Sequence, residues 1–345
     1  ILYYIAQLIG MSMIAMAFGK FASKLIGIEN NLELWDQVFA SGLILVLVFL
    51  TLAGSTLIRK VQKVFVMTNL VILAGFAVLL SGQAGGDVVH AESWPEITPL
   101  LGSLALTFFA FTGFAVISNA AGQMAKPESD LPRAMYATIV IVMLLYLGVS
   151  LAVVGSVSAE ELASSGPMLL VQAARSAFGE IGYYVLLVSA VAATITCLNG
   201  GLFGVTNITF TLAEKGQLPS RFMKEVRAST RGLTISALLA LIMINFMSLS
   251  TVALLGGATT LMVYSLVNFG ALRLITDAGF HRVLIMLSVV VCVLTILIWV
   301  VHTFRSSPQT LSVFFSFLVI SFVAEWLLQR IKGRKIRPDA EAHQP

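Results

Sequence analysis

Ten apolar stretches, each about 20 residues long, recur along this chain of 345 residues and constrain its fold more than any other feature. Hydrophobic residues make up 58% of the sequence and charged residues only 11%, which is too little charge for an ordinary water-soluble surface. Each stretch is long enough to cross the hydrocarbon core of a bilayer as a helix. We therefore predict an all-α integral membrane protein. Its expected transmembrane helices lie at about 2–19, 40–58, 64–82, 100–123, 134–157, 182–203, 232–249, 251–272, 283–302 and 311–329.

The distribution of basic residues predicts how these helices are oriented. With ten crossings, 17 of the 21 Lys and Arg residues fall on one side of the membrane, and only Lys20, Lys24, Arg175 and Arg305 fall on the other. Cytoplasmic loops carry the excess of basic residues in membrane proteins. We therefore expect a multi-pass protein of the cell membrane whose termini, including the C-terminus, are cytoplasmic.

The polar residues form no catalytic or metal-binding pattern. The sequence contains no H-E-x-x-H, G-x-S-x-G or P-loop motif, and its two cysteines, Cys197 and Cys292, lie inside apolar runs. An intramembrane enzyme would need paired acid and base groups, which these stretches lack. We predict that the chain is not an enzyme and uses no cofactor and no metal. Its expected partners are a small-molecule substrate and the lipid bilayer, not nucleic acid, and its oligomeric state stays open.

One apolar stretch is interrupted halfway along. In Phe108–Met135, which reads FFAFTGFAVISNAAGQMAKPESDLPRAM, Thr112 and Gly113 interrupt an apolar helix, and a short polar loop follows, closed by Pro132. Lipid cannot satisfy backbone groups that are freed at membrane depth, so such a break must line a cavity or be covered by protein. The Thr112 hydroxyl can satisfy a freed carbonyl. A simple kink in a packed helix is the alternative interpretation.

Three motifs resemble those of the amino acid-polyamine-organocation (APC) permeases. FFAFTGF followed by KPESDLPRA is similar to the sixth-helix signature of these permeases, LAEKGQLP at 212–219 to the loop after helix eight, and YSLVNFGALR at 264–273 to the end of helix ten. The resemblance implies a truncated LeuT-type inverted-repeat bundle in which the ten helices correspond to family helices 3 to 12. The first two family helices would then be missing. The implied segments are a partial first repeat at 1–82, a second repeat at 100–272, two peripheral helices at 283–329 and a cytoplasmic tail at 330–345.

The same resemblance implies secondary transport of amino acids or related amines, by alternating access around a broken helix at Phe111–Phe114. The implied substrate-binding residues are Phe108, Phe111, Thr112, Gly113, Phe114 and Asn199. The candidates for a coupling-ion site are Asn69, Thr206 and Asn207. Several positions lack a charge that the family commonly carries: Asn69, Ala115, Gly122, Gln123 and Asn207. This loss of charge favours a neutral amino acid as the substrate.

Several alternatives remain open from the sequence. Uncharged polar residues in membrane helices often serve only as interhelical hydrogen-bonding groups. Glu325 can be a proton relay, or its side chain can extend toward Arg330 at the membrane surface. The driving force can be a proton gradient, a sodium gradient or exchange. The chain can also be a carrier of another solute, such as a monovalent cation, or a membrane fragment that transports nothing.

Overall fold

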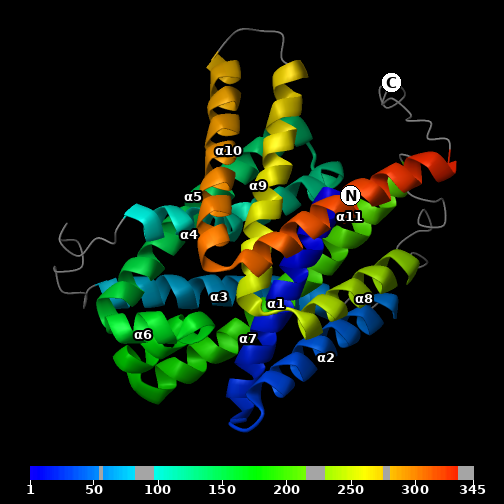
Figure 1. Ribbon diagram of the computed structural model, residues 1–345. Helices are drawn as coiled ribbons and strands as arrows, with labels where there is room; N and C mark the ends of the chain where they lie inside the picture. The colour runs from blue at the N-terminus through cyan, green and yellow to red at the C-terminus, as the bar shows by residue number, and fades with distance from the viewer. Residues whose placement is uncertain (54–56, 82–96, 215–229, 275–279, 333–345) are drawn as a thin grey trace. The chain divides into compact units, whose positions relative to one another are not determined.

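Every regular element in the part of the chain that the structure describes is a helix. The computed structural model describes residues 1–53, 57–81, 97–214, 230–274 and 280–332. Its elements are α1 (Leu2–Ile26), α2 (Leu32–Leu52), α3 (Leu57–Ser81), α4 (Ile97–Phe111), the 3-10 helix η3 (Thr112–Gln123), α5 (Pro127–Ser156), α6 (Ala159–Ser164), the 3-10 helix η4 (Gly166–Met168), α7 (Leu169–Glu214), α8 (Thr230–Phe246), α9 (Leu249–Leu274), α10 (Phe280–Ser306) and α11 (Pro308–Lys332) (Figure 1). The predicted all-α fold class is confirmed.

The described helices include nine that are long and apolar enough to cross a membrane, and the apolar part of α8, Gly232–Phe246, is shorter. Each of the ten predicted stretches overlaps a described helix. Large apolar side chains stay exposed on these helices, among them Phe246 at 82% and Val71 at 72%. Exposing such surface to water is unfavourable, whereas lipid tails solvate it well. The chain is therefore a multi-pass membrane protein.

The first two helices extend further toward each other than hydropathy predicts. The apolar pattern ends the first helix at residue 19 and begins the second at residue 40, whereas α1 ends at Ile26 and α2 begins at Leu32. Gly27 follows α1 with a left-handed φ of 77°. The amides of Gly27 and Ile28 donate to carbonyls in the last turn of α1, at 3.2 and 3.0 Å. In this Schellman arrangement, a glycine adopts the left-handed conformation without the steric cost of a Cβ. α1 therefore continues past the polar residues that follow position 19 and ends just before Gly27.

Close packing joins the facing ends of α1 and α2. A Cβ added to Gly19 would overlap the backbone carbonyl of Asp36, so only glycine permits this approach. Lys20 Nζ lies 3.5 Å from Asp36 Oδ2, and Asp36 is buried. The charged residues that shorten the predicted helices therefore pair with each other, which lowers the cost of burying the carboxylate.

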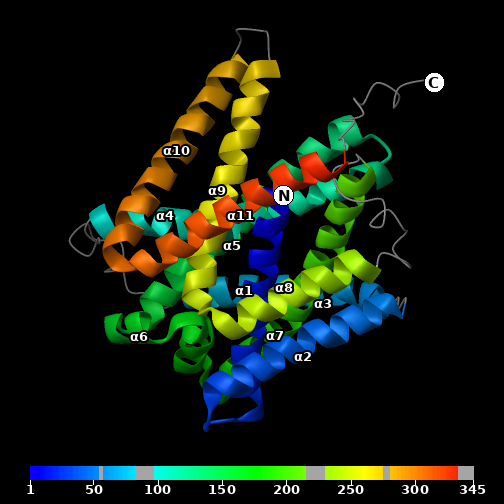
Figure 2. The same ribbon diagram turned by 45° about the vertical axis from the view of Figure 1, so that its right-hand side comes forward.

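The described helices form two compact units. The first unit contains Ile1–Ser12, Glu96–Thr112 and Leu202–Pro345. Within it, α9 and α10 lie side by side in both ribbon views (Figures 1 and 2), and α4 and α11 pack against this pair. The ring of Trp299 on α10, which is fully buried, lies 5.0 Å from that of Phe314 on α11, measured between centroids.

The second unit contains Met13–Pro95 and Gly113–Gly201. Its apolar core includes Phe76 and Leu80 of α3, Ala152 of α5 and Leu187 of α7, all of which are buried. A Cβ on Gly148 of α5 would lie 3.2 Å from the Cβ of an alanine on α3, so this glycine lets the two helices approach closely. Small residues have this role at interfaces between membrane helices.

Two further breaks in the helices agree with turn chemistry. Gly179, with φ 65° and ψ −154°, divides α7 into two helical segments three residues before the predicted start at 182. The predicted division between the stretches at 232–249 and 251–272 is confirmed, because α8 ends at Phe246 and α9 begins at Leu249. The Thr251 amide donates to the Ser248 hydroxyl at 3.3 Å, as an N-terminal capping residue requires.

Candidate functional site

The apolar stretch at 100–123 changes its helix type at the predicted interruption. α4 ends at Phe111, and the chain continues from Thr112 as the 3-10 helix η3, which has 12 residues. Runs of 3-10 helix longer than three or four residues are uncommon because their hydrogen-bond geometry is poorer than that of an α-helix. Within a longer helix, such a stretch often marks a hinge. The interruption is therefore a change of helix type, with no extended segment between α4 and η3.

Thr112 and Gly113 occupy the start of η3. Thr112 Oγ1 donates to the carbonyl of Phe109 at 2.8 Å, so this hydroxyl satisfies a backbone carbonyl as predicted. Gly113 is exposed, and a Cβ added there would meet no described atom within 4 Å. Neither a positive φ nor a close contact requires glycine at this position. Its effect is to leave the backbone uncovered where the helix type changes.

Two aromatic residues of α4 pack against α9. The ring of Phe108 stands edge-on to that of Tyr264, with centroids 5.7 Å apart. Phe109, which sequence reasoning missed, fills space that glycines leave free: a Cβ on Gly256 would lie 2.6 Å from Phe109 Cζ, and one on Gly10 would lie 3.8 Å away. A signal for this contact was present in the Gly256-Gly257 pair, because adjacent small residues in a membrane helix permit close packing.

The two other phenylalanines of the predicted site flank the change of helix type. Phe111 is the last residue of α4 and Phe114 is the third residue of η3, and both are half-buried. The boundary between the compact units falls directly after Thr112. The first unit contains Phe108, Phe111 and Thr112, and the second contains Gly113, Phe114 and Asn199. The assembly of all six residues into one substrate site stays a prediction.

A polar seam, made of Gln62, Asn69, Ser189 and Asn199, joins α3 to α7 within the second unit. The Ser189 hydroxyl donates to Asn69 Oδ1, and Asn199 Nδ2 donates to Gln62 Oε1 at 3.5 Å. Ser189 and Asn199 are separated by about 15 Å along α7, at 1.5 Å per residue. Asn69 and Asn199 therefore lie at different depths of the seam. Each has the interhelical hydrogen-bonding role that the sequence leaves open.

The remaining coupling-ion candidates lie further along α7. Thr206 is buried, and its hydroxyl donates to the Leu202 carbonyl at 2.7 Å. The neighbouring Asn207 is half-buried. A hydroxyl that donates within its own helix still has lone pairs able to accept a hydrogen bond or ligate a cation. This local geometry is compatible with a coupling role for Thr206.

The KPESDLPRA motif begins a helix, which corrects the predicted loop. α5 begins at Pro127, whereas the apolar pattern predicts a start at residue 134. Pro127 occupies the first helical turn, where its missing N–H costs nothing, and the acidic Glu128 and Asp130 lie at the positive end of the helix dipole. Asp130 Oδ2 also accepts a hydrogen bond from the Lys126 amide at 3.3 Å.

The structure describes all of the YSLVNFGALR motif but only the first part of LAEKGQLP. YSLVNFGALR lies within α9, and the first three residues of LAEKGQLP end α7. Residues 215–219 of that motif lie outside the described residues, as does the predicted tail after residue 332.

The candidate residues offer only neutral chemistry. They provide aromatic rings, hydroxyl and amide groups and uncovered backbone, while the Lys20–Asp36 and Arg175–Glu180 ion pairs lie elsewhere, near helix ends. In the part of the chain that the structure describes, no group of three His, Cys, Asp or Glu residues could hold a metal ion. The candidate residues can therefore bind a small solute by hydrogen bonds and apolar contact.

Several known proteins similar to this chain are named as transporters or permeases. A family model described as amino acid permease matches residues 1–324. The chain is 25% identical over 335 residues to the inner membrane transport protein YbaT of Escherichia coli, covering 96% of this chain and 77% of that protein. It is 26% identical over 226 residues to the gamma-aminobutyric acid permease of Bacillus subtilis, covering 59% of this chain and 46% of that one. It is 30% identical over 196 residues to the Asc-type amino acid transporter 1 of Mus musculus, covering 50% of this chain and 35% of that transporter.

Proposed function

This chain belongs to the amino acid permease family, and we propose that it transports neutral amino acids or related amines across the cell membrane. Members of this family are transporters rather than enzymes, in agreement with the sequence prediction. The relatives that are named as permeases or transporters support transport of amino acids or related solutes. The neutral class follows from the candidate site, none of whose residues is charged. A substrate with a charged side chain would lose hydration there without gaining a counter-charge.

The observation that carries this proposal is the change from α-helix to 3-10 helix between Phe111 and Thr112. In our mechanism, the uncovered backbone at Gly113 hydrogen-bonds the polar groups of the amino acid. The rings of Phe111 and Phe114 close over the substrate and exclude water. Because the hydrogen bonds of a 3-10 helix are weaker than those of an α-helix, η3 can bend at a lower cost than a continuous α-helix.

We propose that this bending accompanies alternating access in a LeuT-type bundle. The proposed segments are a partial first repeat at 1–82, a second repeat at 100–272, two peripheral helices at 283–329 and a cytoplasmic tail at 330–345. Helices interrupted at membrane depth are typical of substrate sites in such inverted-repeat carriers. The basic residues of the loops support the orientation with a cytoplasmic C-terminus.

We propose Asn69, Thr206 and Asn207 as the coupling-ion candidates. Their amide and hydroxyl oxygens are suitable ligands for a hard cation, whereas none of the three can take up or release a proton near neutral pH. Sodium coupling therefore fits these residues better than proton coupling. Uptake into proteoliposomes with a sodium gradient, a proton gradient or an internal amino acid distinguishes the two couplings from exchange.

The test of the substrate site is Gly113→Trp in the complete carrier. An indole side chain at this position would cover the backbone that we assign to the substrate, so we expect uptake of labelled neutral amino acids to fall to background. Gly270→Trp is a matched control, because Gly270 is also exposed and has open space around it. We expect this control to retain uptake.

Two measurements complete the test. The amounts of both variants in the membrane fraction are compared, so that a failure of insertion is separated from a failure of transport. Competition by a panel of amino acids and monovalent cations then identifies the solute. Unchanged uptake by Gly113→Trp would refute the site, and competition by cations alone would replace the amino acid with an inorganic solute.

A further inference from the structure

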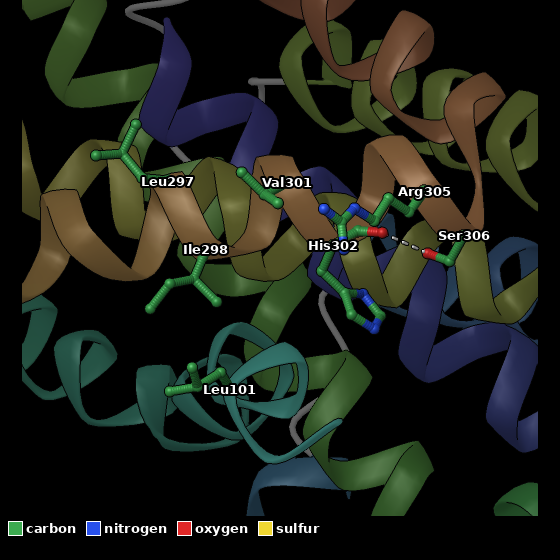
Figure 3. Close-up of a pocket in the computed structure, with 7 residues that line it drawn as sticks. All are labelled: Leu101, Leu297, Ile298, Val301, His302, Arg305 and Ser306. Atoms are coloured by element: carbon green, nitrogen blue, oxygen red, sulfur yellow. Dashed lines mark hydrogen bonds between the residues drawn. The ribbon is translucent and has the colours of Figure 1, made fainter. Parts of the chain in front are cut away.

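A groove of about 530 Å³ lies between α4 and α10 in the first unit. Its apolar wall consists of Leu101 on α4 and of Leu297, Ile298 and Val301 on α10 (Figure 3). Its polar end consists of His302, Arg305 and Ser306, which lie together in the last turn of α10. The distance along α10 from Leu297 to Arg305 is about 12 Å, at 1.5 Å per residue. The groove therefore combines a long apolar side with a cationic end.

The apolar wall of the groove is open. Leu297 and Val301 are each 55% exposed, and Leu101 is 36% exposed. A site for a small polar solute would enclose most of its ligand. Because this wall belongs to membrane-spanning helices, its exposed side chains contact hydrocarbon, so the part of a ligand that lies along it must also be apolar.

The polar end of the groove presents hydrogen-bond donors. The Ser306 hydroxyl donates to the backbone carbonyl of His302 at 2.9 Å. The hydroxyl proton of Ser306 is therefore already used in a hydrogen bond. Arg305 is exposed, and no carboxylate of the described residues lies within ion-pair distance of its guanidinium. The guanidinium of an arginine carries five N–H groups in a planar fork, and this geometry suits the oxygens of a phosphate.

The imidazole of His302 is positioned by a glycine on the facing helix. A Cβ added to Gly102 would lie 2.6 Å from His302 Cδ2 and 2.7 Å from Nε2, so the ring lies directly against the backbone of α4. Gly102 is buried and His302 is half-buried. Any larger residue at position 102 would push the ring out of its place at the end of the groove.

We propose that this groove binds one anionic phospholipid. Its phosphate lies at Arg305 and His302, and one acyl chain follows Leu297, Ile298 and Val301 toward the middle of the membrane. Charge complementarity favours this occupant over a neutral lipid, and the open apolar wall favours it over a soluble phosphate. Arg305 lies one residue before the end of a membrane-spanning helix, which is where lipid head groups are found. This inference does not depend on the solute that the chain transports.

The test is native mass spectrometry of the complete protein titrated with phosphatidylglycerol or with phosphatidylcholine of the same acyl chains. We expect the wild type to retain one phosphatidylglycerol more tightly than phosphatidylcholine. Arg305→Gln should weaken phosphatidylglycerol binding by about tenfold, the change expected for one lost charge-assisted hydrogen bond, and leave phosphatidylcholine unchanged. Arg282→Gln is the matched control, since Arg282 is an exposed arginine at the opposite end of the same helix.

Gly102→Ala provides an independent second variant. It keeps every charge and displaces only the flexible end of the His302 side chain, so the fold should be retained while phosphatidylglycerol binding weakens. Equal binding of the two lipids, or equal losses in Arg305→Gln and Arg282→Gln, would overturn the proposal. Full competition by soluble glycerol phosphate would also overturn it, because the site would then recognise phosphate without an acyl chain.

Discussion

Replacing Gly256 of α9 with alanine should disturb the candidate site from a neighbouring helix. The new Cβ would lie 2.6, 2.9 and 3.0 Å from Phe109 Cζ, Cε2 and Cε1, whereas carbon atoms pack favourably at about 3.5–4.0 Å. The ring must therefore move by about 1 Å, and overpacking of this kind costs about 1–3 kcal/mol. Alanine offsets about 1 kcal/mol of this cost, because it is a better helix former than glycine. We expect a net loss in the free energy of unfolding of about 0–2 kcal/mol.

The displaced ring should also lower amino acid uptake. The Phe109 carbonyl accepts the Thr112 hydroxyl at 2.8 Å, so a movement of Phe109 strains the bond at the start of η3. Gly270→Ala on the same helix is the matched control, because its Cβ would meet no described atom within 4 Å. This control should gain about 1 kcal/mol of stability and retain uptake.

The assay is denaturant unfolding of both variants in detergent micelles, together with uptake into proteoliposomes. The two variants should differ by about 1–3 kcal/mol, or about 5- to 150-fold in the unfolding equilibrium constant. Phe109→Leu removes the ring, so Gly256→Ala should cost less in that background, and a double-mutant cycle measures the coupling. Equal stabilities of Gly256→Ala and Gly270→Ala would refute the packing argument.

Two further predictions concern the second unit. Gly27→Ala should destabilise the protein by about 1–2 kcal/mol, which is the cost of placing a Cβ in left-handed backbone. Gly42→Ala in α2 is the control and should not destabilise it, because a Cβ there meets open space. Thermal unfolding in micelles compares the two variants, and equal unfolding temperatures would contradict the Schellman ending of α1. Ser189→Ala and Asn69→Leu should show a coupling energy of about 0.6 kcal/mol in a double-mutant cycle, which is the average for hydrogen bonds between membrane helices. Additive losses of stability would show that this hydrogen bond does not stabilise the contact between α3 and α7.

The positions of the helices could be predicted from hydropathy, but several of their ends could not. A window of apolar residues identifies the part of a helix that crosses hydrocarbon, whereas a helix ends where its backbone hydrogen bonds are satisfied. α1 continues past the polar residues after position 19 because Lys20 has a partner in Asp36 and because the first suitable stop is Gly27. The start of α5 at Pro127 was readable from the proline and the acidic residues that follow it.

The candidate site was predictable only where its chemistry is local. The role of the Thr112 hydroxyl follows from its position in the sequence, because its partner is the carbonyl of Phe109, three residues earlier. The contact between Phe109 and Gly256 joins residues that are far apart in the chain, and no periodicity within α4 identifies Phe109 as the residue that fills the space of a distant glycine. The partners of Asn69 and Asn199 depend in the same way on how α3 and α7 are aligned.

The packing role of the polar seam leaves its neutral groups able to take part in the proposed transport role. In lipid, apolar burial does not drive helices together, so small residues and hydrogen-bonding side chains supply much of the attraction between them. Asn69 Oδ1 accepts one hydrogen bond from Ser189, and an amide oxygen has a second lone pair. A cation that binds to this second lone pair leaves the contact between α3 and α7 intact. Coupling at Asn69 is therefore compatible with its packing role, and replacing Ser189 alone should lower stability while leaving ion dependence unchanged.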